Sequence, residues 1–137
     1  MADYVAVYGS LRRGQQAESK MARMEFVGRG VISASLYALG WYPGIKFDGK
    51  GNFTIVEVFK LPKAEQLRGA ILYDLDGYEG YNERNPAGSL FVRRQTLVAM
   101  GEGEQELLSY VYEYNYPVNR APLVENGDWN DYKRVSV

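Results

Sequence analysis

The sequence VAVYGSLRRG, residues 5–14, joins a strand-forming run to a turn that ends it abruptly. Residues 3–8 are rich in valine and tyrosine, which predicts a mostly buried first strand. Gly9 and Gly14 bound a turn that carries Ser10 and two arginines. This turn is either a plain surface loop or an anion site, in which consecutive backbone N–H groups converge on a carboxylate or phosphate. The stretch by itself leaves both interpretations open.

The two glycines of this turn match the spacing of the phosphate-binding loop G-x-x-x-x-G-K-S/T. The residues that follow are Gln15 and Gln16, in place of the lysine that reaches the phosphates and the hydroxyl that holds magnesium. Nucleotide binding therefore becomes a minor alternative. The turn still offers the amides of Gly9, Ser10 and Leu11, with the Ser10 hydroxyl, to one small anion.

Length and composition limit the possible functions. We expect residues 1–137 to form a single domain with its own core. The net charge is −1, from 16 basic and 17 acidic residues, and provides no field that would attract nucleic acid or an anionic membrane. No apolar run approaches the ~18 residues of a spanning helix, and the first residues lack the pattern of a signal peptide. We expect a cytoplasmic monomer that binds neither nucleic acid nor membrane.

The sequence contains no cysteine and no histidine. Disulfides, thiolate nucleophiles and histidine general bases are therefore excluded, as are the usual zinc sites. If the chain is an enzyme, its chemistry depends on carboxylates, hydroxyls, lysine, arginine and backbone dipoles.

Further along the chain, strand patterns outnumber helix patterns. Residues 44–60 predict a hairpin, with IKF and FTIVEVFKL as strands and DGKGN as the turn. Residues 62–76 predict the one clear helix, which should end near Gly77 and be followed by a loop over residues 77–88. The segment at residues 15–24 is compatible with a short helix.

The remaining strands are expected at residues 30–39, 90–100 and 106–114. The last two are separated by the acidic turn GEGEQ, and the C-terminal tail is expected to be irregular. About six strands with one helix do not alternate as βαβ units, so the fold class is α+β with a curved or barrel-like mixed sheet.

The segment LDGYEGYNER, residues 75–84, contains the candidate for acid–base chemistry. Glu79 follows the predicted helix and lies between two glycines and two tyrosines. A carboxylate against aromatic rings loses solvation, which raises its pKa from about 4.3 towards the neutral range that a general base needs. The alternative is a solvated loop glutamate, as Asp74, Asp76 and Glu83 could also be.

Four tyrosines recur at every second residue, at Tyr110, Tyr112, Tyr114 and Tyr116. This period places their side chains on one face of a strand, where they either pack against the sheet or form a binding wall.

Three further side chains have open roles. Arg93 and Arg94 point to opposite faces of their strand, so at most one faces inwards. Trp129 either docks the C-terminal tail or lines a pocket.

The combination of YGSLRRG, LDGYEG and a following FVRR strand resembles the gamma-glutamylcyclotransferase-like family. The resemblance is to the branch that includes gamma-glutamylamine cyclotransferase and the AIG2-like proteins, and it implies a small mixed-sheet barrel with few helices. It implies that Tyr8, Gly9, Ser10 and Leu11 bind the gamma-glutamyl group. It also implies that Glu79 is the catalytic acid and base.

The resemblance implies a cofactor-independent transferase reaction without a metal. The α-amine of a small gamma-glutamyl substrate attacks its own side-chain amide, forms 5-oxoproline and releases an amine or amino acid. The leaving group stays open among glutathione-like, gamma-glutamyl-amine, isopeptide and antibiotic-intermediate compounds, since the segment GYNERNPAGSLFVRR is longer than in many relatives.

Two other classes of protein remain compatible with the sequence. A non-catalytic binder of small gamma-glutamyl carboxylates would keep the turn and would not need a perturbed Glu79. A phosphate-binding protein or hydrolase would need Arg12 or Arg13 aimed into the turn.

Overall fold

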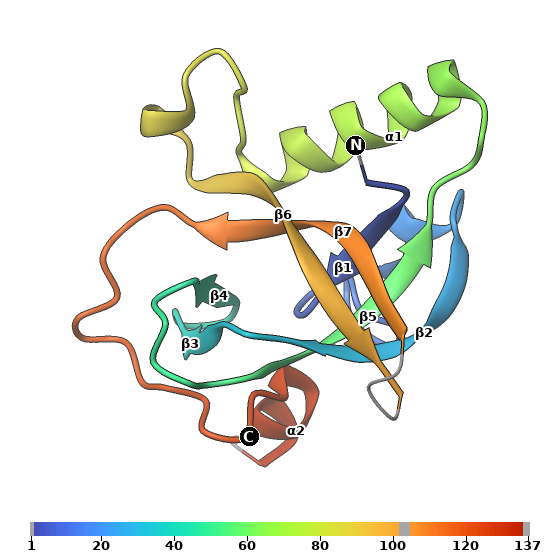
Figure 1. The fold of residues 1–137 in the computed structure, drawn as a ribbon. Helices are drawn as coiled ribbons and strands as arrows, with labels where there is room; N and C mark the ends of the chain where they lie inside the picture. Colours follow the sequence, from blue (N-terminus) through green and yellow to red (C-terminus); the bar gives the residue numbers. More distant parts are fainter. Residues whose placement is uncertain (1, 102–104, 136–137) are drawn as a thin grey trace.

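In the computed structural model, which describes residues 2–101 and 105–135, the valine-rich run before the first turn forms strand β1. It belongs to a closed barrel with the strand order β1-β5-β2-β6-β7 (Figure 1). The barrel strands are β1 (Tyr4–Val7), β2 (Glu25–Ile32), β5 (Thr54–Lys60), β6 (Phe91–Met100) and β7 (Gln105–Tyr114). β1 pairs parallel with β7, and the other neighbours pair antiparallel. The predicted α+β class with a barrel-like mixed sheet is confirmed.

β6 and β7 confirm the two strands predicted near the C-terminus. They pair from Phe91 opposite Tyr114 to Met100 opposite Gln105, without a register shift. The predicted turn GEGEQ spans residues 101–105, of which 102–104 lie outside the described residues.

The predicted hairpin over residues 44–60 is wrong. Its first half forms β4 (Pro43–Lys46), which pairs with β3 (Ser35–Ala38) in a separate two-stranded sheet. Its second half is β5, which lies between β1 and β2 in the barrel. Alternating hydrophobicity shows which face of a strand is buried, but it does not identify the strand's partner. The two strands of the predicted hairpin are neighbours in sequence, yet each pairs with other strands.

The strand predicted at residues 30–39 is in fact two strands. β2 begins earlier, at Glu25, and ends at Ile32, and β3 starts at Ser35. Between them the N–H of Ala34 donates to the carbonyl of Ile32, which marks a tight bend that sends the chain from the barrel into the small sheet.

Helix α1 (Glu65–Glu79) begins later and ends later than predicted. The predicted stop at Gly77 is wrong, because the left-handed residue that ends the helix is Gly80, with φ of 68°. Glu79 is thus the last residue of the helix and does not belong to a loop. Residues 15–24 form turns around the short 3₁₀ helix η1 (Glu18–Met21), and η2 (Pro86–Gly88) lies within the loop after α1.

The C-terminal tail is irregular up to residue 128, as predicted, but the prediction is wrong for the residues that follow. They form α2 (Trp129–Val135), whose first N–H groups, on Asn130 and Asp131, donate to the Asp128 carboxylate. Trp129 is 2% exposed in a core cluster with side chains from β1 and β5, so its role is to dock the tail.

The core has two clusters, separated by alternation along the strands. Val5 and Val7 of β1 belong to the cluster that includes Ile71 and Leu75 of α1. Ala6 of β1 belongs to the other cluster, with Trp129. Figure 1 shows α1 and α2 on opposite sides of the molecule, so each cluster lies towards one helix. In the described part of the chain, neither helix is long and apolar enough to cross a membrane.

Candidate active site

A cavity of about 330 Å³ opens where the end of β1 meets the end of α1. Tyr8, Gly9, Ser10 and Leu11 line it from the turn after β1, and Glu79 lines it from α1. The two segments are in direct contact, since Ser10 Oγ lies 2.8 Å from the hydroxyl of Tyr78. The structure therefore brings together the turn and the glutamate that the sequence singled out separately.

Hydrogen bonds hold the backbone of the turn in place, and three of its N–H groups remain without an acceptor among the described residues. The N–H of Arg12 donates to Gly9 O over 3.0 Å, and the N–H of Ala17 donates to Ser10 O over 2.9 Å. Within residues 2–101 and 105–135, the N–H groups of Gly9, Ser10 and Leu11 donate to no acceptor. Successive free N–H groups on a cavity wall can bind a carboxylate or another small anion.

Gly9 allows the turn to lie against Pro43, the first residue of β4. A Cβ on Gly9 would lie 2.7 Å from Cγ of Pro43, closer than such atoms approach. Any side chain at this position would therefore displace the turn, so glycine is required by a close contact and not by its backbone angles.

Glu79 is a carboxylate without a partner. Its side chain is partly buried, and no described residue donates a hydrogen bond to it or forms an ion pair with it. Burial raises the pKa of Glu79 from 4.5 to about 8. With a pKa near neutrality, this carboxyl group can exchange a proton with a ligand at neutral pH.

Two tyrosines border the cavity with their hydroxyls already bonded. The Tyr8 hydroxyl donates to Tyr112 O over 2.7 Å. Burial, and then the charge of Glu79, raise the pKa of Tyr8 well above its usual range. The Tyr112 hydroxyl donates to Asp76 Oδ1 over 2.6 Å, and burial followed by this bond raises the pKa of Tyr112. Both phenols stay protonated and offer their rings to the cavity.

Asp76 lies one helical turn before Glu79 and has a full set of partners. Both of its oxygens accept from Nη1 of Arg93, over 3.0 and 2.8 Å. Burial raises the pKa of Asp76, although the bonds from Tyr112 and Arg93 act in the opposite direction. Asp76 was expected from the sequence only as a possible solvated residue, and its hydrogen bond from Tyr112 was not predicted.

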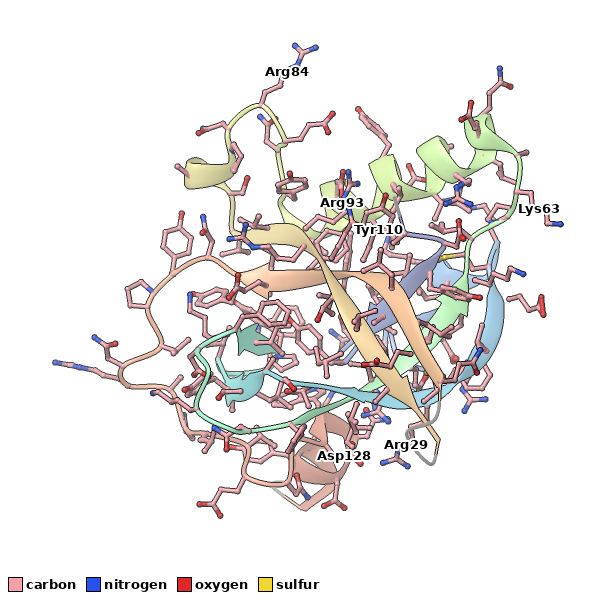
Figure 2. The ribbon with its side chains drawn as sticks, in the orientation of Figure 1. Arg29, Lys63, Arg84, Arg93, Tyr110 and Asp128 are labelled. Carbon is pink, nitrogen blue, oxygen red and sulfur yellow. The ribbon has the colours of Figure 1, made fainter. Side chains whose placement is uncertain are left out.

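The arginine pair on β6 confirms that at most one member faces inwards. Arg93 lies beneath α1 beside Tyr110 in Figure 2, with its guanidinium carbon 5.2 Å from the centre of the Tyr110 ring. Arg94 points to the opposite side, where it donates to Glu113 over 3.0 Å and remains half exposed.

The tyrosines of β7 have different environments. Tyr112 lines the cavity, whereas Tyr110 and Tyr114 do not. Tyr114 packs between the rings of Phe91 and Tyr116, with centres 5.4 and 5.9 Å away. Of the three tyrosines proposed as lining, the structure thus brings one to the cavity.

The rest of the wall was not foreseen from the sequence. It consists of aromatic and aliphatic side chains from the β3–β4 connection and from the start of β6: Trp41, Tyr42, Pro43, Leu90 and Phe91. The only local signal was the run WYP beside a turn, and it does not indicate which element the run will contact.

The arginines of the first turn do not line the cavity. Arg12 is 3% exposed and donates to Glu57 over 3.1 Å and to Asp128 over 2.8 Å. The guanidinium carbon of Arg13 lies 3.5 Å from the centre of the Phe26 ring. The phosphate interpretation needed one of them aimed into the turn, and the structure contradicts it. In the residues described, no group of three or more acidic side chains is arranged to hold a metal ion.

Comparisons with known proteins show which family this chain belongs to. A family model described as gamma-glutamyl cyclotransferase, AIG2-like, matches residues 5–131. The gamma-glutamylcyclotransferase family protein YtfP of Escherichia coli (strain K12) is 30% identical over 129 residues, which cover 93% of this chain and 96% of that protein.

Solved structures agree with these matches. The solution structure of ytfP from Escherichia coli is similar with a TM-score of 0.62 at 28% identity, over 95% of this chain and 98% of that chain. The crystal structure of an AIG2-like protein from Mus musculus is similar in fold, with a TM-score of 0.68 at 22% identity, over 90% of this chain and 86% of that chain.

Proposed function

This chain belongs to the gamma-glutamyl cyclotransferase, AIG2-like family, and we propose that it converts a small gamma-glutamyl compound into 5-oxoproline and a free amine. The observation that carries the proposal is that Glu79, an unpaired carboxylate with a pKa of about 8, lines the same cavity as Gly9, Ser10 and Leu11, whose backbone N–H groups are free among the described residues. The substrate needs both features, because it presents a carboxylate and an ammonium group on the same carbon.

The turn binds the α-carboxylate of the substrate. The N–H groups of Gly9, Ser10 and Leu11 are its donors, and the Ser10 hydroxyl, now bonded to Tyr78, adds one more. This anchor fixes the α-carbon, so the α-nitrogen lies on the side of Glu79. The rings of Tyr8 and Tyr112 exclude water from the reacting atoms.

The reaction is intramolecular. A bond forms between the α-nitrogen and the side-chain carbonyl carbon, and the bond from that carbon to the leaving nitrogen breaks. Two protons leave the α-ammonium in total: one lets the leaving nitrogen depart as an amine, and the other converts that amine to its ammonium form. No water is consumed. Holding the chain folded for attack can supply about 7–11 kcal/mol of the barrier in well-oriented cases.

Glu79 transfers these protons. An α-amino group has a pKa of about 8, close to that of Glu79 in the cavity, so transfer between them is nearly balanced in energy. The carboxylate takes a proton from the α-nitrogen, gives it to the leaving nitrogen and is regenerated. One residue serves as base and then acid, in a chain without histidine or cysteine.

The proposal is tested by measuring 5-oxoproline by mass spectrometry after incubation with a panel of gamma-glutamyl compounds. We expect turnover by the wild type and a loss of about 10²–10⁴-fold in kcat for Glu79→Gln, with binding in isothermal calorimetry retained. Glu83→Gln is the matched control, since it makes the same change at an exposed position four residues away and should keep full activity.

Two outcomes would contradict the proposal. Equal turnover by wild type and Glu79→Gln would remove Glu79 from the chemistry. Binding of gamma-glutamyl compounds without any 5-oxoproline would make the chain a non-catalytic binder that uses the same turn.

A further inference from the structure

The part of the cavity wall formed by Trp41, Tyr42, Leu90 and Phe91 has a uniform chemistry. It bears on the leaving group of the proposed reaction, on which this inference rests. With the glutamyl end held by the turn and Glu79, the amine to be released faces Trp41, Tyr42, Leu90 and Phe91. All four side chains are aromatic or aliphatic. Among the described residues that line the cavity, Glu79 is the only acidic one, and none is a lysine or an arginine.

Exposure shows which of these side chains form the entrance. Trp41 is 66% exposed and Leu90 is 40% exposed, whereas Phe91 is 5% exposed. Trp41 and Leu90 therefore form the lip of the cavity, and Phe91 lies deeper. Exposed large apolar groups at the rim of a concave site are typical of surfaces that bind an apolar ligand.

The aromatic wall is held in shape by its own contacts. The ring centres of Trp41 and Tyr42 lie 5.0 Å apart, and those of Tyr42 and Phe91 lie 6.3 Å apart. The N–H of Leu39 donates to Tyr42 O over 2.9 Å and closes the turn that carries them. A Cβ on Gly44 would lie 2.8 Å from Cβ of Tyr114, so the small sheet packs directly against β7. A preorganised apolar wall binds without a large ordering cost.

Nearby cations are engaged elsewhere. Lys46 Nζ donates to Tyr114 O over 2.9 Å, and Arg93 is bound to Asp76. Lys20 Nζ lies 5.0 Å from the centre of the ring of Tyr78, which lines the cavity, but Lys20 itself lines a separate depression with Arg23. Arg84 points into solvent from the loop above β6 in Figure 2. A carboxylate on the leaving group would lose water at this wall without gaining an ion pair from its lining.

We propose that the substrate's leaving group is an amine whose substituent is apolar and carries no charge, and that Trp41 and Leu90 select it over amino acids and peptides that carry a carboxylate. The enzyme would then release a simple aromatic or aliphatic amine from a gamma-glutamyl amide. Glutathione-like compounds would be poor substrates, because their leaving group ends in a carboxylate.

The test compares gamma-L-glutamyl-benzylamide with gamma-L-glutamyl-L-phenylalanine, which differ mainly by one carboxylate. We expect kcat/KM for the benzylamide to be higher by at least about 10-fold, the range that pocket contacts provide. The mono-gamma-glutamyl derivative of 1,5-diaminopentane tests a cationic end and should fall below the benzylamide. The ethylamide measures the reaction with little contact to the lip.

Variants of the lip test the assignment of its residues. Trp41→Ala should lower kcat/KM for the benzylamide by about 10-fold and leave the ethylamide within about twofold. Leu90→Arg should raise the activity on gamma-glutamyl-phenylalanine relative to the benzylamide by about 10-fold, since it supplies the missing cation. Tyr73→Ala is the matched control: it removes an aromatic ring that is 80% exposed on α1 and does not line the cavity.

The outcomes separate this inference from the proposed function. Release of 5-oxoproline with equal or better activity on gamma-glutamyl-phenylalanine or on the diamine derivative would overturn the inference and leave the cyclotransferase proposal standing. If no compound gives 5-oxoproline, the proposed reaction fails. Calorimetric affinities for the same panel then decide whether the site still prefers an apolar end, and equal affinities would overturn that as well.

Discussion

The two sides of the loop after β1 differ in whether the charged groups beside them have partners. On one side, Arg12 is buried and donates to two carboxylates, Glu57 and Asp128. On the other side, residues 9–11, whose N–H groups have no acceptor among the described residues, line the same cavity as Glu79. Arg12, whose charge is fully paired, directly follows Leu11, the last of the three residues with free N–H groups.

The difference shows how the fold separates structure from chemistry. A buried charge with partners keeps its charge and fixes the elements it joins, here the loop, β5 and the start of α2. A buried carboxylate without partners changes its pKa instead, as Glu79 does. Buried groups left without partners by the fold are therefore the ones available to a ligand.

The largest effect is expected from breaking the paired side. Arg12→Met should destabilise the protein by about 3–5 kcal/mol, because it leaves Glu57 and Asp128 without their buried cation. Urea unfolding at pH 7 measures the loss. A change below about 1 kcal/mol would show that Arg12 is not what holds the loop against β5 and α2.

On the unpaired side, the free energy of unfolding should depend on pH through Glu79. The pKa of Glu79 is about 8 in the folded protein and near 4.5 when unfolded, so the folded state binds the proton more tightly. This contribution to stability is complete below pH 4.5 and is lost as pH rises to about 8. Glu79→Gln cannot lose it and should exceed the wild type at pH 9 by about 1–3 kcal/mol, allowing for partial contact with water.

The measurement is urea unfolding of both proteins at pH 5, 7 and 9, read as the difference between them so that other titrating groups cancel. The two proteins should be nearly equal at pH 5. Parallel curves from pH 5 to 9 would mean that Glu79 is solvated, and they would remove the basis for its role as a base.

The sequence predicted the parts of the fold that depend on local pattern. β1, β6 and β7 carry enough β-branched and aromatic residues to be recognised alone. The partners of residues 44–60 depend on closure of the barrel, which no local window contains. The helix α2 has seven residues and depends on burial of Trp129 and on Asp128, which also binds Arg12.

The site residues, too, divide into those that a local motif predicts and those that only the fold brings together. The turn and Glu79 were found because each lies in a short motif and because tyrosines adjoin the glutamate in the sequence. The aromatic wall was not found, because Trp41 and Phe91 come from elements that meet only after the sheet has closed. Arg12 and Arg13 are adjacent and chemically identical, so only the fold decides that Arg12 is the buried one.

A smaller effect tests the position of the free N–H groups. Gly9→Ala places a methyl group 2.7 Å from Cγ of Pro43, so the turn or Pro43 must shift. We expect kcat/KM for 5-oxoproline formation to fall by about 10-fold, because reaction rates depend steeply on alignment. Gly69→Ala is the control, since a methyl group on this helical glycine meets no other atom within 4 Å and should leave activity unchanged. Unaltered kinetics for Gly9→Ala would show that the turn does not position the substrate.

The smallest effect is expected at the exposed edge of the paired side. Arg29 donates to the same carboxylate as Arg12, over 2.8 Å to Asp128 Oδ2. Figure 2 shows Arg29 and Asp128 close together. Because Arg29 is 59% exposed, Arg29→Ala should cost no more than about 0.5 kcal/mol in urea unfolding, and the cost should shrink further in 1 M NaCl. Arg12 and Arg29 share a partner and differ in burial, so the ratio of their effects isolates the contribution of burial. A loss as large as that of Arg12→Met would mean that neutralising Asp128 stabilises this side of the loop, and that burial of the cation is secondary.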